Sequence, residues 1–203
     1  LDPRIMEMCT PIIYGSPKVA AYHRKALNIN NLSLNHVRNP KEAGPKRAHV
    51  LNCIDDNVRV ELGKSTPIAG EASFMALDRA TTDLQEGLID VLITAPINKD
   101  NIQSEKFNFP GHTEFLAQKF GAKDYLMLMV SETMKVGLVT THLPISEVTN
   151  YITKERILSK LRIIDQSMQQ DFAITRPRIA VFGLNPHAGD NGLLGKEEID
   201  IIQ

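Results

Sequence analysis

Apolar runs of strand length alternate with segments of helical period along the chain, and this alternation limits the fold more than any other feature. The expected strands are residues 11–14, 88–95, 125–130, 135–141 and 178–184, with weaker candidates at 49–54 and 58–61. The expected helices are residues 17–27, 68–85, 113–120 and 153–171. Strands that alternate with helices predict an α/β fold with mixed, largely parallel sheets.

Charge and cysteine content exclude several classes of protein. The 203 residues include 23 Lys and Arg against 24 Asp and Glu, a net charge of −1 that argues against binding to nucleic acid. Cys9 and Cys53 are the only cysteines, too few for a disulfide framework, and they favour a reducing cytoplasm. No apolar run approaches the ~20 residues that span a bilayer, so no membrane partner is expected.

Both ends of the sequence suggest a longer polypeptide. The chain begins at Leu1 without an initiator methionine. Residues 196–203 have the pattern of a helix that lacks a C-cap. We therefore expect this sequence to be part of a larger protein.

Two histidines each follow an apolar strand-like run and are candidate metal ligands. His142 lies in VTTHLP, and His187 lies in GLNPHAGDNG. Ligands in α/β proteins gather at the carboxyl ends of strands, and neutral imidazole binds divalent transition ions. The alternative is that each is a buried histidine with a backbone partner. Two histidines are also one ligand short of the three that a catalytic zinc site usually has.

Other segments offer groups for an anion. In PGHTEFLA, Gly111 permits close approach of a ligand, and His112 and Thr113 open a helix; the alternative is that Thr113 is only an N-cap. Lys99, in TAPINK, can meet a phosphate or carboxylate, or can be an ordinary surface lysine. Asn185 and the Gly-rich loop that begins at Gly189 can hold a phosphate or a cofactor through backbone amides. Neither GxGxxG nor GxxxxGK[ST] is present.

Taken together and in this order, TAPINK, PGHTEFLA, VTTHLP and GLNPHAGDNGLLGKEE resemble the 4-hydroxythreonine-4-phosphate dehydrogenase family of pyridoxal phosphate biosynthesis. The resemblance implies an isocitrate/isopropylmalate dehydrogenase-like two-domain fold, divided here as residues 1–102 and 103–203, the second being the dimerisation and metal/substrate domain. It also implies a homodimer with a shared active site.

The same resemblance implies an activity, in which NAD and a divalent metal (Zn, Mg or Co) serve the oxidation and decarboxylation of 4-phosphooxy-L-threonine. His112 and Thr113 match the family's substrate-binding pair, and His142 and His187 match two of its three metal ligands. His112 or Lys99 is the expected catalytic base, and Asn185 and Gly189 are expected at the cofactor.

The sequence departs from the family at both ends. It lacks a GDPxGIGPE-like opening and the later YHDQG-like block that carries the third metal histidine. Three other functions stay open: a dehydrogenase for threonate or erythronate 4-phosphate on the same scaffold, a metal-dependent hydrolase that needs no NAD, and a non-catalytic dimerising fragment.

Overall fold

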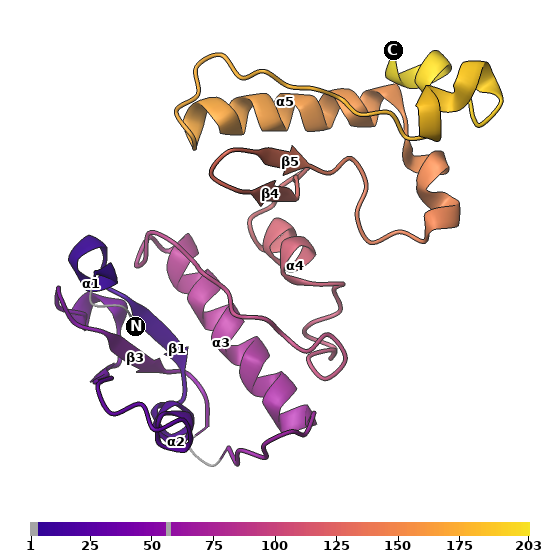
Figure 1. Cartoon of the computed structure of the whole chain (residues 1–203). Coiled ribbons are helices and arrows are strands. Elements are labelled where there is room, and N and C mark those ends of the chain that lie inside the picture. Colours follow the sequence, from indigo (N-terminus) through magenta and orange to yellow (C-terminus); the bar gives the residue numbers. More distant parts are fainter. Residues whose placement is uncertain (1–3, 56–57) are drawn as a thin grey trace. The chain divides into compact units, whose positions relative to one another are not determined.

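The structure, a computed structural model, describes residues 4–55 and 58–203, which form two compact units, 1–120 and 121–203 (Figure 1). This division follows packing, and the boundary expected at 102/103 stays a prediction. The elements of the first unit are α1 (Ile5–Met8), β1 (Ile12–Gly15), α2 (Pro17–Ala26), β2 (Asn35–Val37), η1 (Pro40–Glu42), β3 (His49–Asn52), α3 (Pro67–Gln85) and α4 (His112–Lys119). Those of the second are β4 (Leu128–Val130), β5 (Lys135–Gly137), η2 (Ile145–Tyr151), α5 (Lys154–Gln170), η3 (Pro186–Gly192) and η4 (Glu198–Ile202).

A three-stranded parallel sheet forms the centre of the first unit, in the order β1-β3-β2. Its middle strand, β3, is the most buried, with Val50 1% and Leu51 0% exposed. The predicted strands at 11–14 and 49–54 are confirmed by β1 and β3, whereas β2 was not expected. The α/β class with a largely parallel sheet is therefore confirmed.

Helix α3 packs on one face of this sheet, whereas α2 has no buried residue. Tyr14 and Leu51 are register partners on one face, where the Tyr14 hydroxyl donates to Asp83 of α3 at 2.7 Å. Val50 points to the other face and lines a hollow together with Pro17 of α2. Both helices lie where the sequence predicts them.

The second core of the first unit is aromatic. Phe107 is fully buried, and its ring centroid lies 5.4 Å from those of Phe109 and Phe115. Phe74 brings α3 into the same cluster, so these rings join α3, α4 and the loop between them.

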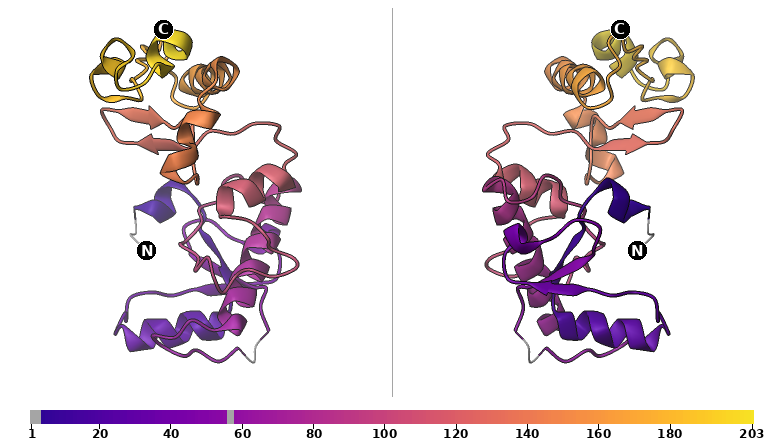
Figure 2. Two further views of the ribbon diagram at one scale, coloured as in Figure 1. Left: turned by 90° about the vertical axis from the view of Figure 1, so that its right-hand side faces the viewer. Right: turned by 90° about the vertical axis from the view of Figure 1, so that its left-hand side faces the viewer.

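The second unit is a hairpin covered by a helix. Strands β4 and β5 pair antiparallel, and α5 lies along them in Figure 1 and is seen end-on beside them in Figure 2. A Cβ on Gly137 of β5 would lie 3.0 Å from Ile164 of α5, which shows how closely the two pack. Ile157 and Met168 of α5 are buried.

Three expected strands are wrong. Residues 58–61, 88–95 and 178–184 form no strand. The last two are apolar, yet Ile93 is 90% and Phe182 82% exposed. An apolar run becomes a strand only when its backbone groups find a ladder partner, and these segments have no ladder partner among the described residues.

Within residues 4–55 and 58–203, no helix is both long enough and apolar enough to cross a membrane.

Candidate functional site

A tight turn fixes the backbone on either side of Lys99. The Asn98 side-chain oxygen accepts the backbone N–H groups of Asp100 and Asn101, at 3.0 and 3.2 Å, and its amide nitrogen donates to Ser65 at 3.2 Å. Such side-chain bonds to the following backbone are the reason asparagine favours turns. The turn around Lys99 is thus defined by its own sequence.

The loop that carries this turn lies directly on α3. The Asn101 side chain donates to Thr66 O, at the start of α3, at 3.1 Å. A Cβ on Gly70 would lie 2.9 Å from Ile102 N and nearer still to the backbone of Asn101. Glycine is therefore required in this turn of the helix for the loop to come so close.

A glutamine joins the two ends of the same loop. The Gln103 side chain donates to Lys99 O at 3.1 Å and to Phe109 O at 2.9 Å. Ile102 and Phe107, 1% and 0% exposed, anchor the loop in the aromatic core. These contacts bring Lys99 back to the segment that opens α4.

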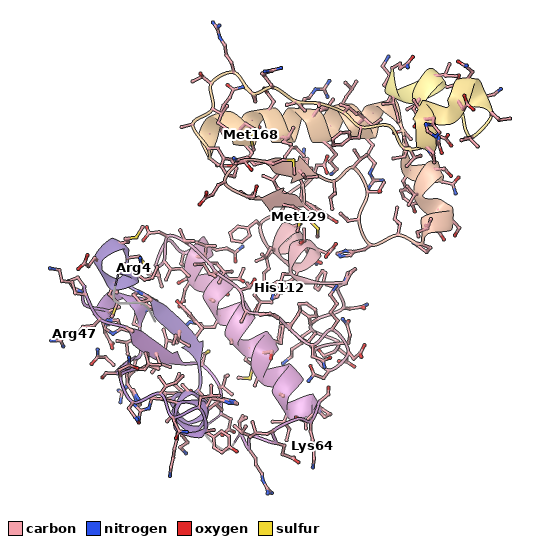
Figure 3. All side chains as sticks on the ribbon, viewed as in Figure 1. Arg4, Arg47, Lys64, His112, Met129 and Met168 are labelled. Atoms are coloured by element: carbon pink, nitrogen blue, oxygen red, sulfur yellow. The ribbon has the colours of Figure 1, made fainter. Side chains whose placement is uncertain are left out.

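The start of α4 holds the predicted substrate-binding pair (Figure 3). Gly111 is the N-cap, so the alternative role of Thr113 as the N-cap is wrong. A Cβ on Gly111 would lie 3.8 Å from Lys99 Cε and 4.0 Å from Lys99 Nζ. The structure therefore brings Lys99, Gly111, His112 and Thr113 together.

Partial burial, and secondly the positive charge of Lys99, lower the pKa of His112. Its imidazole is therefore neutral at pH 7 and able to accept a proton. The Lys99 ammonium and the N-terminus of α4 both favour an anion at this place, where they oppose the carboxylate of Glu114, whose Oε2 would lie 3.8 Å from a Cβ on Gly111. The arrangement can bind a negatively charged substrate beside a neutral base.

Both candidate metal ligands lie in the second unit and have unusual backbones. His142 has φ 55° and His187 has φ 52°, in the left-handed region that few residues other than glycine adopt. Both are exposed, so neither is the buried histidine of the alternative reading. Their imidazoles suit a divalent transition ion. Among residues 4–55 and 58–203, however, no three His, Cys, Asp or Glu side chains gather to hold a metal, so further ligands are needed.

His187 begins a run of five residues in left-handed conformation. The φ angles of residues 187–191 are 52°, 51°, 80°, 46° and 55°. Gly189 adopts this conformation without strain, Asp190 and Asn191 tolerate it better than most residues, and Ala188 costs roughly 1–2 kcal/mol there. Backbone strain of this kind persists where the surroundings hold it, which is common at functional sites.

A buried carboxylate that the sequence reading missed holds this segment. Glu198 is 3% exposed and accepts the backbone N–H groups of Leu184 and Asn185, both at 2.6 Å. Hydrogen bonds from the backbone and side chain of Asn185 lower the pKa of Glu198. The available signal was the acidic pair that follows the Gly-rich loop in GLNPHAGDNGLLGKEE.

The two candidate cofactor residues, Asn185 and Gly189, lie in the loop that Glu198 holds. The Asn185 side-chain amide donates to Glu197 at 2.7 Å and to Glu198 at 3.0 Å. Gly189 is buried, and its carbonyl oxygen accepts from Leu194 N at 2.9 Å. Their place at a cofactor stays a prediction. Because the Asn185 amide nitrogen already donates both of its hydrogens, its side chain could bind a cofactor only by accepting a hydrogen bond at its oxygen.

A shallow, open hollow lies elsewhere. It has a volume of about 700 Å³ against α2 and the strands β2 and β3, and none of the predicted site residues lines it. Lys18, His36, Arg38 and Glu42 line it. Volume alone therefore does not locate the chemistry, and the site rests on the side chains described above.

Comparisons with known proteins agree with the sequence blocks. A family described as pyridoxal phosphate biosynthetic protein PdxA matches residues 7–203. A 4-hydroxythreonine-4-phosphate dehydrogenase from Bacteroides thetaiotaomicron is 55% identical over 203 residues, which cover 99% of this chain and 55% of the relative. A putative D-threonate 4-phosphate dehydrogenase from Symbiobacterium thermophilum is 31% identical over 207 residues, covering 100% of this chain and 61% of the relative.

Solved structures show the same likeness. The crystal structure of 4-hydroxythreonine-4-phosphate dehydrogenase from Klebsiella pneumoniae matches with a TM-score of 0.79 and 32% identity, covering 94% of this chain and 58% of that one. The chain thus spans little more than half the length of the relatives it matches.

Proposed function

We propose a function on one premise: the chain belongs to the pyridoxal phosphate biosynthetic protein PdxA family. The full-length protein oxidises 4-phosphooxy-L-threonine with NAD⁺ and a divalent metal, and the keto acid formed loses CO₂. The identity of 55% to the dehydrogenase from Bacteroides thetaiotaomicron supports this substrate.

One observation carries the proposal, namely the placement of Lys99 beside Gly111 and His112. The phosphorylated substrate carries the negative charge that Lys99 and the start of α4 favour, and Thr113 adds a hydroxyl there. His112, neutral at pH 7, would accept the proton of the substrate hydroxyl, and a bound NAD⁺ would supply the hydride acceptor. Lys99 binds the anion and keeps His112 in its basic form.

His142 and His187 are the proposed metal ligands. Their chemistry fits a divalent ion, although the described residues do not complete its donor set. When bound, such an ion supplies Lewis-acid polarisation of the substrate oxygen. Asn185 and Gly189 are the proposed cofactor contacts.

A second copy of the protein is the proposed source of the missing groups. The hairpin β4–β5 exposes Met129, Val130 and Met134, which are 55–60% accessible and suit an apolar two-fold interface. The cytoplasm is the proposed compartment, because Cys9 and Cys53 are both free thiols.

The direct test measures NADH formation by the full-length protein with 4-phosphooxy-L-threonine, with and without EDTA. We expect turnover that chelation abolishes and that added Zn²⁺, Mg²⁺ or Co²⁺ restores. Full activity in excess EDTA contradicts the proposed metal dependence. Consumption of the substrate without NAD⁺ indicates a hydrolase instead.

The second candidate substrate is a 4-phosphorylated sugar acid. The 31% identity to the putative D-threonate 4-phosphate dehydrogenase supports it less strongly than the 55% identity supports the amino acid. A higher kcat/KM with threonate or erythronate 4-phosphate than with 4-phosphooxy-L-threonine would assign the enzyme to that activity.

A further inference from the structure

We infer that Glu198 is the positioning residue for His187, an inference that rests on the proposed role of His187 as a metal ligand. Glu198 is 3% exposed although it is ionisable, so its burial requires partners. Oε1 accepts two backbone N–H groups, from Leu184 and Asn185, at 2.6 Å each. Oε2 accepts from the side chain of Asn185 at 3.0 Å.

The path from this carboxylate to His187 is short and stiff. Glu198 holds Asn185 by both its backbone and its side chain. Pro186 follows, with a φ angle locked by its ring, and His187 comes next. Little rotational freedom therefore remains between the bonded carboxylate and the backbone that carries the imidazole.

The turn that begins at His187 needs such support. Four of the five residues in 187–191 are not glycine, yet all five are left-handed. The hydrogen bonds from Leu184 and Asn185 to Glu198 are called the clasp here. Two further bonds close the turn: Leu193 N donates to Asp190 O at 3.2 Å, and Leu194 N donates to Gly189 O at 2.9 Å. Without the clasp at its start, the segment can relax toward ordinary backbone angles and carry His187 with it.

The loop is shaped around the carboxylate. A Cβ on Gly183 would lie 3.1 Å from Glu198 Oε1, and a Cβ on Gly189 would lie 3.2 Å from Oε2. Its neighbour Glu197 accepts the side-chain amide of Asn185 at 2.7 Å, but within the described part of the chain it accepts no backbone N–H of this loop. Glu197 is thus a matched control one residue away.

Glutamine is the informative replacement for Glu198. It keeps the size of the side chain, but it turns one acceptor oxygen into an NH₂ group. In the place of Oε1, that group would face the backbone N–H donors of Leu184 and Asn185. In the place of Oε2, it would face the side-chain amide of Asn185, so at least one bond of the clasp is lost in either case. Groups that hydrogen-bond directly to a metal ligand typically change metal affinity 10–100-fold when replaced, and the lower end of that range is expected for Glu198, which acts on His187 through the backbone.

The experiment titrates Co²⁺ into the full-length protein and records both the dissociation constant and the visible ligand-field spectrum. The variants are Glu198→Gln, Glu198→Asp, Glu197→Gln and His187→Ala, and thermal unfolding of each metal-free protein is measured alongside. We expect Glu198→Gln to weaken Co²⁺ binding about tenfold or more with an altered spectrum. Glu197→Gln should stay near the wild type.

Each outcome decides between positioning and simple stabilisation. If Glu198→Gln lowers the unfolding temperature but binds Co²⁺ with wild-type affinity and spectrum, the inference is overturned. If Glu198→Gln does not fold, Glu198→Asp decides, because it keeps the charge but withdraws the carboxylate by one methylene; weaker binding supports the inference, and unchanged binding overturns it. Unchanged binding in His187→Ala instead refutes the metal role in the proposed function, and the inference falls with it.

Discussion

Replacing Gly70 with alanine is expected to destabilise the first unit and to displace Lys99. The added Cβ would lie 2.9 Å from Ile102 N and nearer still to Asn101. Ordinary contacts of carbon lie at about 3.5–4.0 Å, so the loop must retreat by at least about half an ångström. The obstructing atoms are backbone, and they cannot rotate away as a side chain can.

Two opposing effects set the magnitude. Alanine stabilises a helix by up to about 1 kcal/mol relative to glycine. Overpacking in a close contact costs about 1–3 kcal/mol, and Ile102 beside the contact is 1% exposed, so the upper part of that range applies. We expect a net loss of about 1–2 kcal/mol in the free energy of unfolding.

Urea unfolding followed by circular dichroism measures this loss, and kcat/KM of the full-length enzyme reports the displacement of Lys99. Gly44→Ala is the matched control, because nothing lies within 4 Å of a Cβ at Gly44. That control should be neutral or stabilising by less than about 1 kcal/mol. A Gly70→Ala protein as stable as the wild type would refute the argument from close approach.

Two further predictions concern titratable groups. Tyr14→Phe removes the bond to Asp83 and should lower the free energy of unfolding by about 1–2 kcal/mol. Burial and that bond raise the pKa of Tyr14, so wild-type stability should fall as the pH rises above the ordinary value of 10.0, and urea midpoints of Tyr14→Phe should lack this decline. Lys99→Met removes a charge that lowers the pKa of His112, so the acid limb of the pH profile of kcat/KM should move to higher pH. Lys106→Met, in the same loop, should leave that limb in place, and an unmoved limb in Lys99→Met excludes His112 as the base coupled to it.

Helices were predictable because the residues at their N-termini determine where they begin. Ser16, Thr66 and Thr153 each accept a backbone N–H from three residues ahead, at 3.2–3.3 Å. Such caps need no knowledge of the rest of the fold. The sequence therefore located α2, α3 and α5 to within one or two residues.

Strands were predictable only where a partner strand exists. β1 formed as expected because β3 pairs with it, whereas 88–95 and 178–184 are apolar but have no ladder partner among the described residues. Apolar composition indicates that burial is favourable, but it does not show whether a partner strand lies alongside. The short strand β2 is the converse case: its sequence has only a weak strand pattern, but it forms a strand because β3 pairs with it.

The candidate site divides along the same line. Lys99 and His112 were identified from their segments, and the loop contacts that unite them span only a few residues. The clasp of Glu198 was missed, because it joins backbone groups 13 and 14 residues away. No local pattern reports which carboxylate will turn back onto a loop.

The glycines of the last loop show why such a pattern is ambiguous. A glycine-rich segment after an apolar run favours the approach of an anion, and it was read as a cradle for phosphate or cofactor. In the structure, Gly183 and Gly189 admit the carboxylate of Glu198, and a Cβ at Gly195 would lie 2.6 Å from an oxygen of Glu197. Carboxylates of the chain itself thus lie close to these glycines, and a cofactor contact at Gly189 stays a prediction. Small residues therefore indicate where a negative group comes close, while only the fold decides whether that group is a ligand or a side chain that holds a ligand's binding residue in place.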